Sequence, residues 1–247
     1  MKVTDNTVLI TGGGSGIGLA LARLFAARGN TVIAAGRRED VLAAAQKAIP
    51  GLQTIRADVS GEAGRIELAK EAAARFPALN VLVNNAGIQQ HPEPLLQPQD
   101  WSAHRAEIAV NLEAPVHLTM LLLPHLAKAA QAAIVNVTSG LAFVPIAAMS
   151  TYCLTKAGLH SFTQSLRHQL RDTKIGVVEI APPAVDTDLG GPGLHTFGVN
   201  VDAFAKHVLA GLEKGETEIG YQMSEGARLA NREQQAEIFA RLNANRP

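Results

Sequence analysis

Short runs of apolar, mostly β-branched residues recur along the chain and alternate with longer segments rich in Ala and Leu. Within each run apolar residues follow one another almost without interruption, which is typical of parallel strands buried on both faces. The runs predict strands at Thr7–Ile10, Thr31–Ala35, Gln53–Ala57, Val81–Val83, Ala133–Thr138 and Ile175–Ile180, with a last strand at Glu218–Tyr221.

The segments between these runs place apolar residues at helical spacing. They predict helices at Ile17–Arg28, Glu39–Ile49, Ala63–Phe76, Trp101–Ala130, Ser150–Arg171, Val201–Lys214 and Glu225–Asn243. Repeated strand-helix-strand units predict an α/β fold: a doubly wound, mostly parallel Rossmann-type sheet of about seven strands with helices on both faces. A length of 247 residues fits one domain over residues 1–247.

One long stretch, Pro182–Asn200, has no regular pattern and contains four glycines and three prolines. Irregular segments of this length in compact domains often close over a binding site. We therefore expect a mobile substrate lid at residues 186–200.

Charge and composition narrow the choice of partner. The 22 Lys and Arg residues balance the 22 Asp and Glu residues, so the chain lacks the positive charge that nucleic acid or an anionic membrane attracts. Leu118–Leu126, the most apolar stretch, is too short to cross a bilayer. The single cysteine, Cys153, and the absence of an apolar signal core in Met1–Ile10 fit the cytoplasm. We expect a small-molecule partner, with no nucleic acid and no membrane.

A glycine-rich turn, Thr11–Gly18, joins the first predicted strand directly to the first helix. Glycine lets the backbone approach a pyrophosphate, and the free amides at the start of the helix receive its charge. The turn predicts a dinucleotide site, and a tight strand-to-helix turn without a ligand is the alternative. The residues expected to bind are Gly12, Gly14, Ser15, Gly16, Ile17 and Gly18.

The end of the second strand bears on the choice between NAD and NADP, because an acidic residue there binds the free ribose hydroxyl. This chain has Gly36, Arg37 and Arg38 instead. Arginine suits the 2′-phosphate, so the sequence predicts that NADP(H) is preferred over NAD(H). Two solvated surface arginines are the alternative.

Four residues combine into candidate acid-base chemistry. Tyr152 and Lys156 are four apart on one face of a predicted helix, where the ammonium should lower the pKa of the phenol. Ser139 directly follows a strand at the edge where α/β sheets bind ligands. Pro115 has no N–H, so the Asn111 carbonyl loses its helical partner and is free to hold a water, unless the proline merely kinks the helix.

Together these motifs resemble the short-chain dehydrogenases/reductases in their compact single-domain form, over essentially the whole chain. The matching motifs are Thr11–Gly18, Asp58 with Val59, Asn84–Gly87, Asn111, Ser139, Tyr152 and Lys156. The resemblance implies that Tyr152 exchanges a proton with the carbonyl or alcohol oxygen and that Ser139 hydrogen-bonds this oxygen. It also implies that Lys156 holds the nicotinamide ribose and that Asn111 carries a water in a proton relay.

The same resemblance implies further contacts with the cofactor. Asp58 and Val59 would flank the adenine, while Asn85, Ala86, Gly87, Val185 and Thr187 would line the rest of the dinucleotide. Pro183 departs from the family, which usually has glycine at this position, and leaves the substrate less predictable. The helices at Trp101–Ala130 and Ser150–Arg171 would pack against their copies in a homodimer or homotetramer.

A narrower resemblance is to bacterial oxidoreductases whose label refers to D-alanine esterification of teichoic acids. That label names an association with the cell wall and no substrate. The stretches that carry it are Asn85–Gln89, Leu121–Leu126, Ser139–Pro145, Tyr152–Arg167 and Ala181–Thr187.

The sequence thus predicts an NADP(H)-dependent oxidoreductase for a small neutral or apolar carbonyl compound or secondary alcohol. A non-catalytic protein that senses NADP on the same fold is the alternative, and it predicts a broken Asn111, Ser139, Tyr152 and Lys156 set. The spacing of the histidines predicts no metal site. His91 and His195 fall on loops beside the expected cleft and are candidate substrate contacts.

Overall fold

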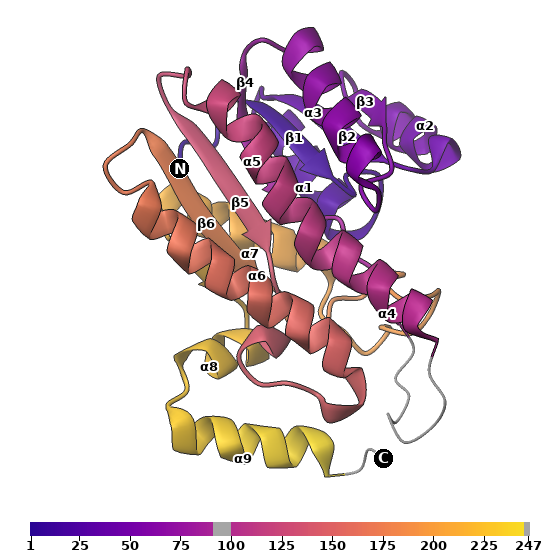
Figure 1. The fold of residues 1–247 in the computed structure, drawn as a ribbon, viewed down its shortest axis with the longest axis vertical. Helices are drawn as coiled ribbons and strands as arrows, with labels where there is room; N and C mark the ends of the chain where they lie inside the picture. Colours follow the sequence, from indigo (N-terminus) through magenta and orange to yellow (C-terminus); the bar gives the residue numbers. More distant parts are fainter. Residues whose placement is uncertain (91–99, 245–247) are drawn as a thin grey trace.

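Seven parallel strands form the central sheet of the computed structural model, which describes residues 1–90 and 100–244 (Figure 1). The strands are β1 (Thr7–Thr11), β2 (Thr31–Gly36), β3 (Gln53–Arg56), β4 (Leu79–Asn84), β5 (Ala132–Val137), β6 (Ile175–Ala181) and β7 (Glu218–Gly220). Their order is β3-β2-β1-β4-β5-β6-β7. The winding therefore reverses between β1 and β4, which is where such sheets bind ligands. The predicted doubly wound fold is confirmed.

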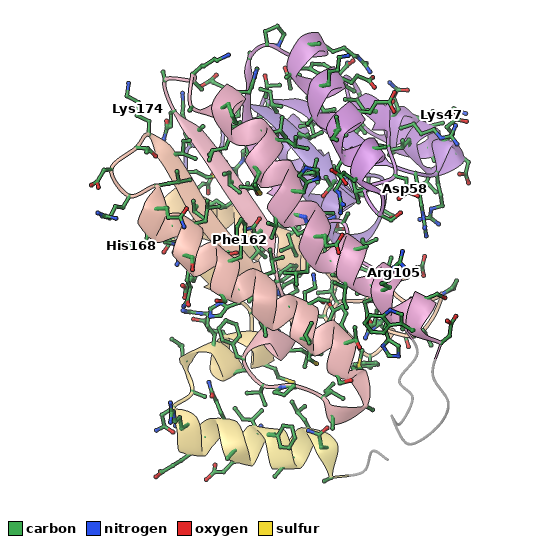
Figure 2. The ribbon with its side chains drawn as sticks, in the orientation of Figure 1. Lys47, Asp58, Arg105, Phe162, His168 and Lys174 are labelled. Atoms are coloured by element: carbon green, nitrogen blue, oxygen red, sulfur yellow. The ribbon has the colours of Figure 1, made fainter. Side chains whose placement is uncertain are left out.

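Helices cover both faces of the sheet. On one face lie α1 (Gly16–Ala26), α2 (Glu39–Ala48) and α7 (Val201–Lys214), and on the other α3 (Glu62–Arg75), α5 (Ala114–Leu126) and α6 (Ser150–Gln169). Figure 1 shows α5 and α6 crossing in front of the strands. The lysines labelled in Figure 2, Lys47 and Lys174, lie at the periphery, where ammonium groups stay in water.

A continuous helix runs from Trp101 to Leu126 through α4 (Trp101–Ile108), a π turn at Ala109–Glu113, and α5. In the π turn the Ala114 N–H donates to the Ala109 carbonyl five residues back. A wider turn suits this position, because the next residue is a proline without an N–H. The helix ends at Leu126, short of the expected Ala130, and it is long and apolar enough to cross a membrane by length and composition alone. Its apolar face packs into the core through Leu118, Leu122 and Leu126.

The expected single helix at Glu225–Asn243 is wrong. The structure has two helices, α8 (Met223–Leu229) and α9 (Arg232–Asn243). Asn231 is extended and starts the second helix, because its side chain accepts from the Gln234 N–H while the Gln234 side chain accepts from the Asn231 N–H. This capping box starts α9 as a helix separate from α8.

Candidate active site

The glycine turn between β1 and α1 is packed too closely for side chains. A Cβ on Gly13 would lie 2.9 Å from the Ala34 Cβ, and a Cβ on Gly18 would lie 2.4 Å from the Gly12 carbonyl oxygen. Gly12 also has a φ of +66°. The first turn of α1 has neither a side-chain cap nor an acidic residue. Its backbone N–H groups therefore meet an anion without competition from the chain's own carboxylates.

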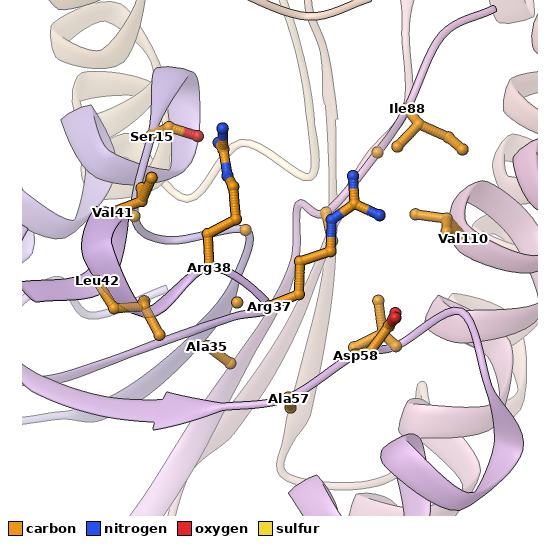
Figure 3. Close-up of a pocket in the computed structure, with 16 residues that line it drawn as sticks. Ser15, Ala35, Arg37, Arg38, Val41, Leu42, Ala57, Asp58, Ile88 and Val110 are labelled. Atoms are coloured by element: carbon orange, nitrogen blue, oxygen red, sulfur yellow. The ribbon is translucent and has the colours of Figure 1, made fainter.

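A cavity extends from this turn across the ends of β2 and β3. Figure 3 shows Arg38 reaching up beside Ser15 and Arg37 reaching toward Ile88 and Val110. The lining includes most of the predicted dinucleotide residues: Gly12, Gly14, Ser15, Arg37, Arg38, Asp58, Val59, Ala86 and Gly87. Hydrogen bonds from Ser60 lower the pKa of Asp58, and the nearby Arg37 charge adds to this effect. Glycines, unpaired amides and two arginines fit a phosphorylated dinucleotide.

Other residues predicted to bind the dinucleotide lie behind the cavity lining and hold it in place. The Asn85 amide donates to the carbonyls of Thr11 (2.9 Å) and Gly12 (3.3 Å), so it holds the glycine turn in place. Ile17 packs against the core beneath the sheet. A Cβ on Gly16 would lie 3.3 Å from Cγ2 of Thr187, which brings the segment after β6 against the turn. Val185, at the start of that segment, is buried.

The cavity adjoins the predicted acid-base residues at Gly87. A Cβ there would lie 3.4 Å from Asn111 Oδ1 and 3.7 Å from Lys156 Nζ. The Asn111 side chain accepts from the Ile88 N–H and donates to the Ile88 carbonyl, both at 2.8 Å. Lys156 Nζ donates to the Val137 carbonyl at 3.0 Å. The loop after β4, the π turn and α6 thus meet at one point.

Two hydroxyl groups from different elements also meet here. Ser139, just past β5, lies close enough to Tyr152 on α6 to lower the pKa of its phenol. The Ser139 Oγ accepts from the Leu141 N–H at 3.1 Å. Lys156 Nζ lies 5.6 Å from the centroid of the Tyr152 ring. The structure therefore brings together all four residues of the set that the sequence predicts.

The side chains of this chain alone do not produce the lowered Tyr152 pKa that is expected when the oxidised nicotinamide adds a second positive charge. Burial raises the pKa of the Tyr152 phenol, and the nearby Ser139 hydroxyl offsets only part of this. Burial also lowers the pKa of Lys156 to about 8. Desolvation dominates because both groups lie almost wholly inside the protein, where either charged form loses its water.

Sequence reasoning missed Glu107, a buried carboxylate one helical turn before Asn111. Its Oε1 accepts from the Gln90 N–H at 2.9 Å. Burial raises the pKa of Glu107, and its charge raises the pKa of both Tyr152 and Lys156. The available signal was an acidic residue on the same helical face as Asn111.

The remaining candidate residues are Cys153 and the histidines. Cys153 is buried, as expected, and burial raises the pKa of its thiol. Among residues 1–90 and 100–244, no three His, Cys, Asp or Glu side chains gather as metal ligands would. His195 lies beside Phe197 with the two rings tilted and their centroids 5.9 Å apart, and its buried Nδ1 has no hydrogen-bond partner among the described residues. His91 lies outside the described residues.

Comparison with known proteins gives one family. Residues 6–194 match the model of the short chain dehydrogenase family. Among curated relatives, an uncharacterized oxidoreductase of Bacillus subtilis strain 168, DltE, is 46% identical over 248 aligned residues, which cover 98% of each chain.

Solved structures share the fold with different dinucleotides bound. A short chain dehydrogenase from Burkholderia cenocepacia J2315 in complex with NADP has a TM-score of 0.83 and 27% identity, with 98% of this chain and 99% of that chain covered. A 3-ketoacyl-(acyl-carrier-protein) reductase from Brucella melitensis complexed with NADH has a TM-score of 0.81 and 26% identity, with 90% and 100% covered.

Proposed function

The chain belongs to the short-chain dehydrogenase family, and we propose that it is an NADP(H)-preferring oxidoreductase that interconverts a small carbonyl compound and a secondary alcohol. The observation that carries the proposal is the meeting of Ser139, Tyr152 and Lys156 beside the glycine-lined cavity. A nucleotide-binding protein without turnover has no need of two hydroxyl groups and a buried amine at that place.

The cavity supports binding of the dinucleotide along its length. Gly12, Gly14 and Ser15 would hold the pyrophosphate at the start of α1, and Arg37 and Arg38 would hold the 2′-phosphate. The bound dinucleotide supplies the hydride for the carbonyl carbon, or accepts it in the reverse direction.

The protein's own side chains handle the proton. In reduction, the Tyr152 hydroxyl gives its proton to the oxygen of the former carbonyl, while the Ser139 hydroxyl donates a hydrogen bond to the same oxygen. Lys156 is close enough to stabilise the phenolate left on Tyr152. Asn111, fixed to Ile88 by two hydrogen bonds, holds the wall of the cleft behind Lys156.

A panel of small ketones, aldehydes and secondary alcohols tests the proposal, with NADPH or NADP⁺ and with NADH or NAD⁺. Turnover read at the nicotinamide absorbance is expected for at least one carbonyl compound. Tight dinucleotide binding without turnover across the panel would contradict the proposal and favour a sensing role.

A further inference from the structure

A buried polar network lies beneath the end of β5, outside the residues given roles above. Glu179 of β6 is 0% exposed. Its carboxylate accepts from the Thr138 hydroxyl at 2.6 Å and from His160 Nδ1 at 2.8 Å. A buried carboxylate destabilises the fold unless hydrogen-bond donors satisfy it. Loss of either hydrogen bond to Glu179 would therefore be unfavourable.

The network connects the two elements that carry the reacting hydroxyl groups. Thr138 directly precedes Ser139 in the sequence, and His160 lies two helical turns after Tyr152 on α6. The backbone adds a second link on the strand side, because the Thr138 N–H donates to the Ile180 carbonyl at 2.8 Å. Glu179 is therefore the bridge between the end of β5 and the helix opposite it.

His160 is held from another side by an aromatic ring. The Phe143 ring meets the imidazole edge-on, with centroids 4.7 Å apart. The short helical turn Gly140–Ala142 begins directly after Ser139, and Phe143 follows that turn. The imidazole thus contacts the segment after Ser139 directly, and Glu179 links it to Thr138 on the other side.

We propose that Thr138, Glu179 and His160 form a positioning network that sets the separation between the Ser139 and Tyr152 hydroxyl groups. The inference rests on the proposed function, because it assigns these residues a part in the same reaction. Both hydroxyl groups must reach one substrate oxygen, and displacement of a reacting group by about 1 Å can cost on the order of a hundredfold in rate. The three residues act through Ser139 and Tyr152 and do not touch the substrate themselves.

The network also has a pH dependence with a defined sign. The hydrogen bond to Glu179 raises the pKa of His160; burial and Arg167 of α6 oppose this, and Glu218 of β7 adds to it. The Thr138 hydroxyl donates to the same Glu179 carboxylate, and the Phe143 ring against the imidazole carries no charge. Stabilisation by the His160 charge is thus full below the ordinary histidine pKa and is lost as the pH rises through the raised one.

Paired substitutions separate positioning from simple packing. Thr138→Val removes the hydroxyl at nearly constant shape, whereas Thr138→Ser keeps it. His160→Leu removes the donor, whereas His160→Asn keeps an N–H near the position of Nδ1. The matched control is His168→Leu, because His168 lies on the same helix at the exposed surface (Figure 2).

With the dinucleotide-loaded protein and an active substrate from the panel, Thr138→Val and His160→Leu should lower kcat at least about tenfold. The KM for the dinucleotide should change less than about twofold, since the network lies on the side of Ser139 away from the glycine turn. Thr138→Ser and His160→Asn should recover kcat to within about threefold, and His168→Leu should match the unmodified protein.

A measurement without turnover gives an independent check. In NMR titrations of the imidazole signals, His160 should titrate above the ordinary histidine range, and Glu179→Gln should return it toward that range. Turnover that depends on Tyr152 but is the same in Thr138→Val, His160→Leu and His168→Leu would overturn the positioning network alone. The absence of turnover in the unmodified protein would overturn the proposed function together with this inference.

Discussion

Tyr152 is the side chain on which the proposed reaction depends most. Tyr152→Phe removes only the phenolic oxygen, so the fold and NADPH binding should stay nearly intact. The value of kcat should fall by a factor on the order of a thousand, since loss of a general acid typically costs about 10²- to 10⁴-fold. Steady-state kinetics and dinucleotide titration measure the two effects separately.

Lys156→Ala is the comparison for that substitution. It removes the buried ammonium, whose Nζ lies 5.6 Å from the Tyr152 ring centroid, so kcat should fall. Dinucleotide affinity should fall as well, because the family resemblance implies that Lys156 holds the nicotinamide ribose. Retention of most activity by Tyr152→Phe on every substrate would refute the assignment of the proton donor.

Glu107 offers a second prediction at this level. Its charge raises the pKa of Tyr152 and Lys156, so Glu107→Gln should make the phenol more acidic and move the pH profile of alcohol oxidation to lower pH.

Burial raises the pKa of Glu107 itself, so its charged form destabilises the fold above its unfolded pKa. The variant should therefore gain more in Tm at pH 8 than at pH 5. Glu237→Gln, at an exposed position on α9, is the control. An unshifted profile would show that Glu107 is electrostatically silent.

Arg37 and Arg38 are predicted to decide the choice of dinucleotide. NADPH should bind at least about tenfold more tightly than NADH, which corresponds to about 1.4 kcal/mol. Replacing both arginines by Ala should weaken mainly NADPH binding, as calorimetry would measure. Equal affinities of the unmodified protein for the two dinucleotides would contradict the role of the arginines.

At the level of elements, the segment at residues 186–200 has a fixed base and a glycine-rich tip. The Asp186 N–H donates to the Val199 carbonyl, and the Val199 N–H donates to the Ala184 carbonyl, both at 2.9 Å. Gly190, Gly191 and Gly193 at the tip all have positive φ. We expect the tip to move as a lid while the hydrogen-bonded base keeps the sheet undisturbed.

Hydrogen exchange tests that lid. Amides near the tip should exchange fast in the free protein and slow down when dinucleotide and substrate or an inhibitor are both bound, because closure removes backbone freedom. Amides of β5 serve as the internal reference, since this strand is buried along its length. Unchanged exchange at the tip in the ternary complex would count against a lid.

Helices and strands that are marked by the pattern of their own residues could be predicted from the sequence. Contacts between residues that are distant in the sequence could not. The central strands are recognisable because both faces are apolar, and the glycine turn because its glycines lie between a strand and a helix. The break before Arg232 was missed, although Asn231 and Gln234 carry a capping-box pattern. Apolar periodicity on both sides masked that local signal.

The candidate site shows the same division. Ser139, Tyr152 and Lys156 are recognisable through spacing and resemblance. The pairing of His160 with Glu179 is not, because the two residues come from different elements and meet only when α6 packs on β6. The sign of the Tyr152 pKa change also required the structure, since it depends on how deeply the phenol is buried.

Apolar side chains on the outer faces of two helices bear on the whole molecule. Met120 of α5 is 64% exposed and Leu154 of α6 is 57% exposed. The family resemblance implies that these helices pack against their copies, which would remove both side chains from water. We therefore expect a homodimer or homotetramer in sedimentation velocity experiments at micromolar concentration.

Substitution of both residues by Glu should shift the protein toward a smaller species, because assembly would then bury charges against apolar side chains without a partner. Met223→Glu is the matched control, since Met223 is 72% exposed but lies on α8, away from these two helices. It should leave the sedimentation coefficient unchanged. A monomeric unmodified protein, or a double variant that sediments like the unmodified one, would contradict assembly through α5 and α6. Because Leu154 lies two residues from both Tyr152 and Lys156, dinucleotide binding by the dissociated variant would also reveal whether assembly holds this part of α6 in place.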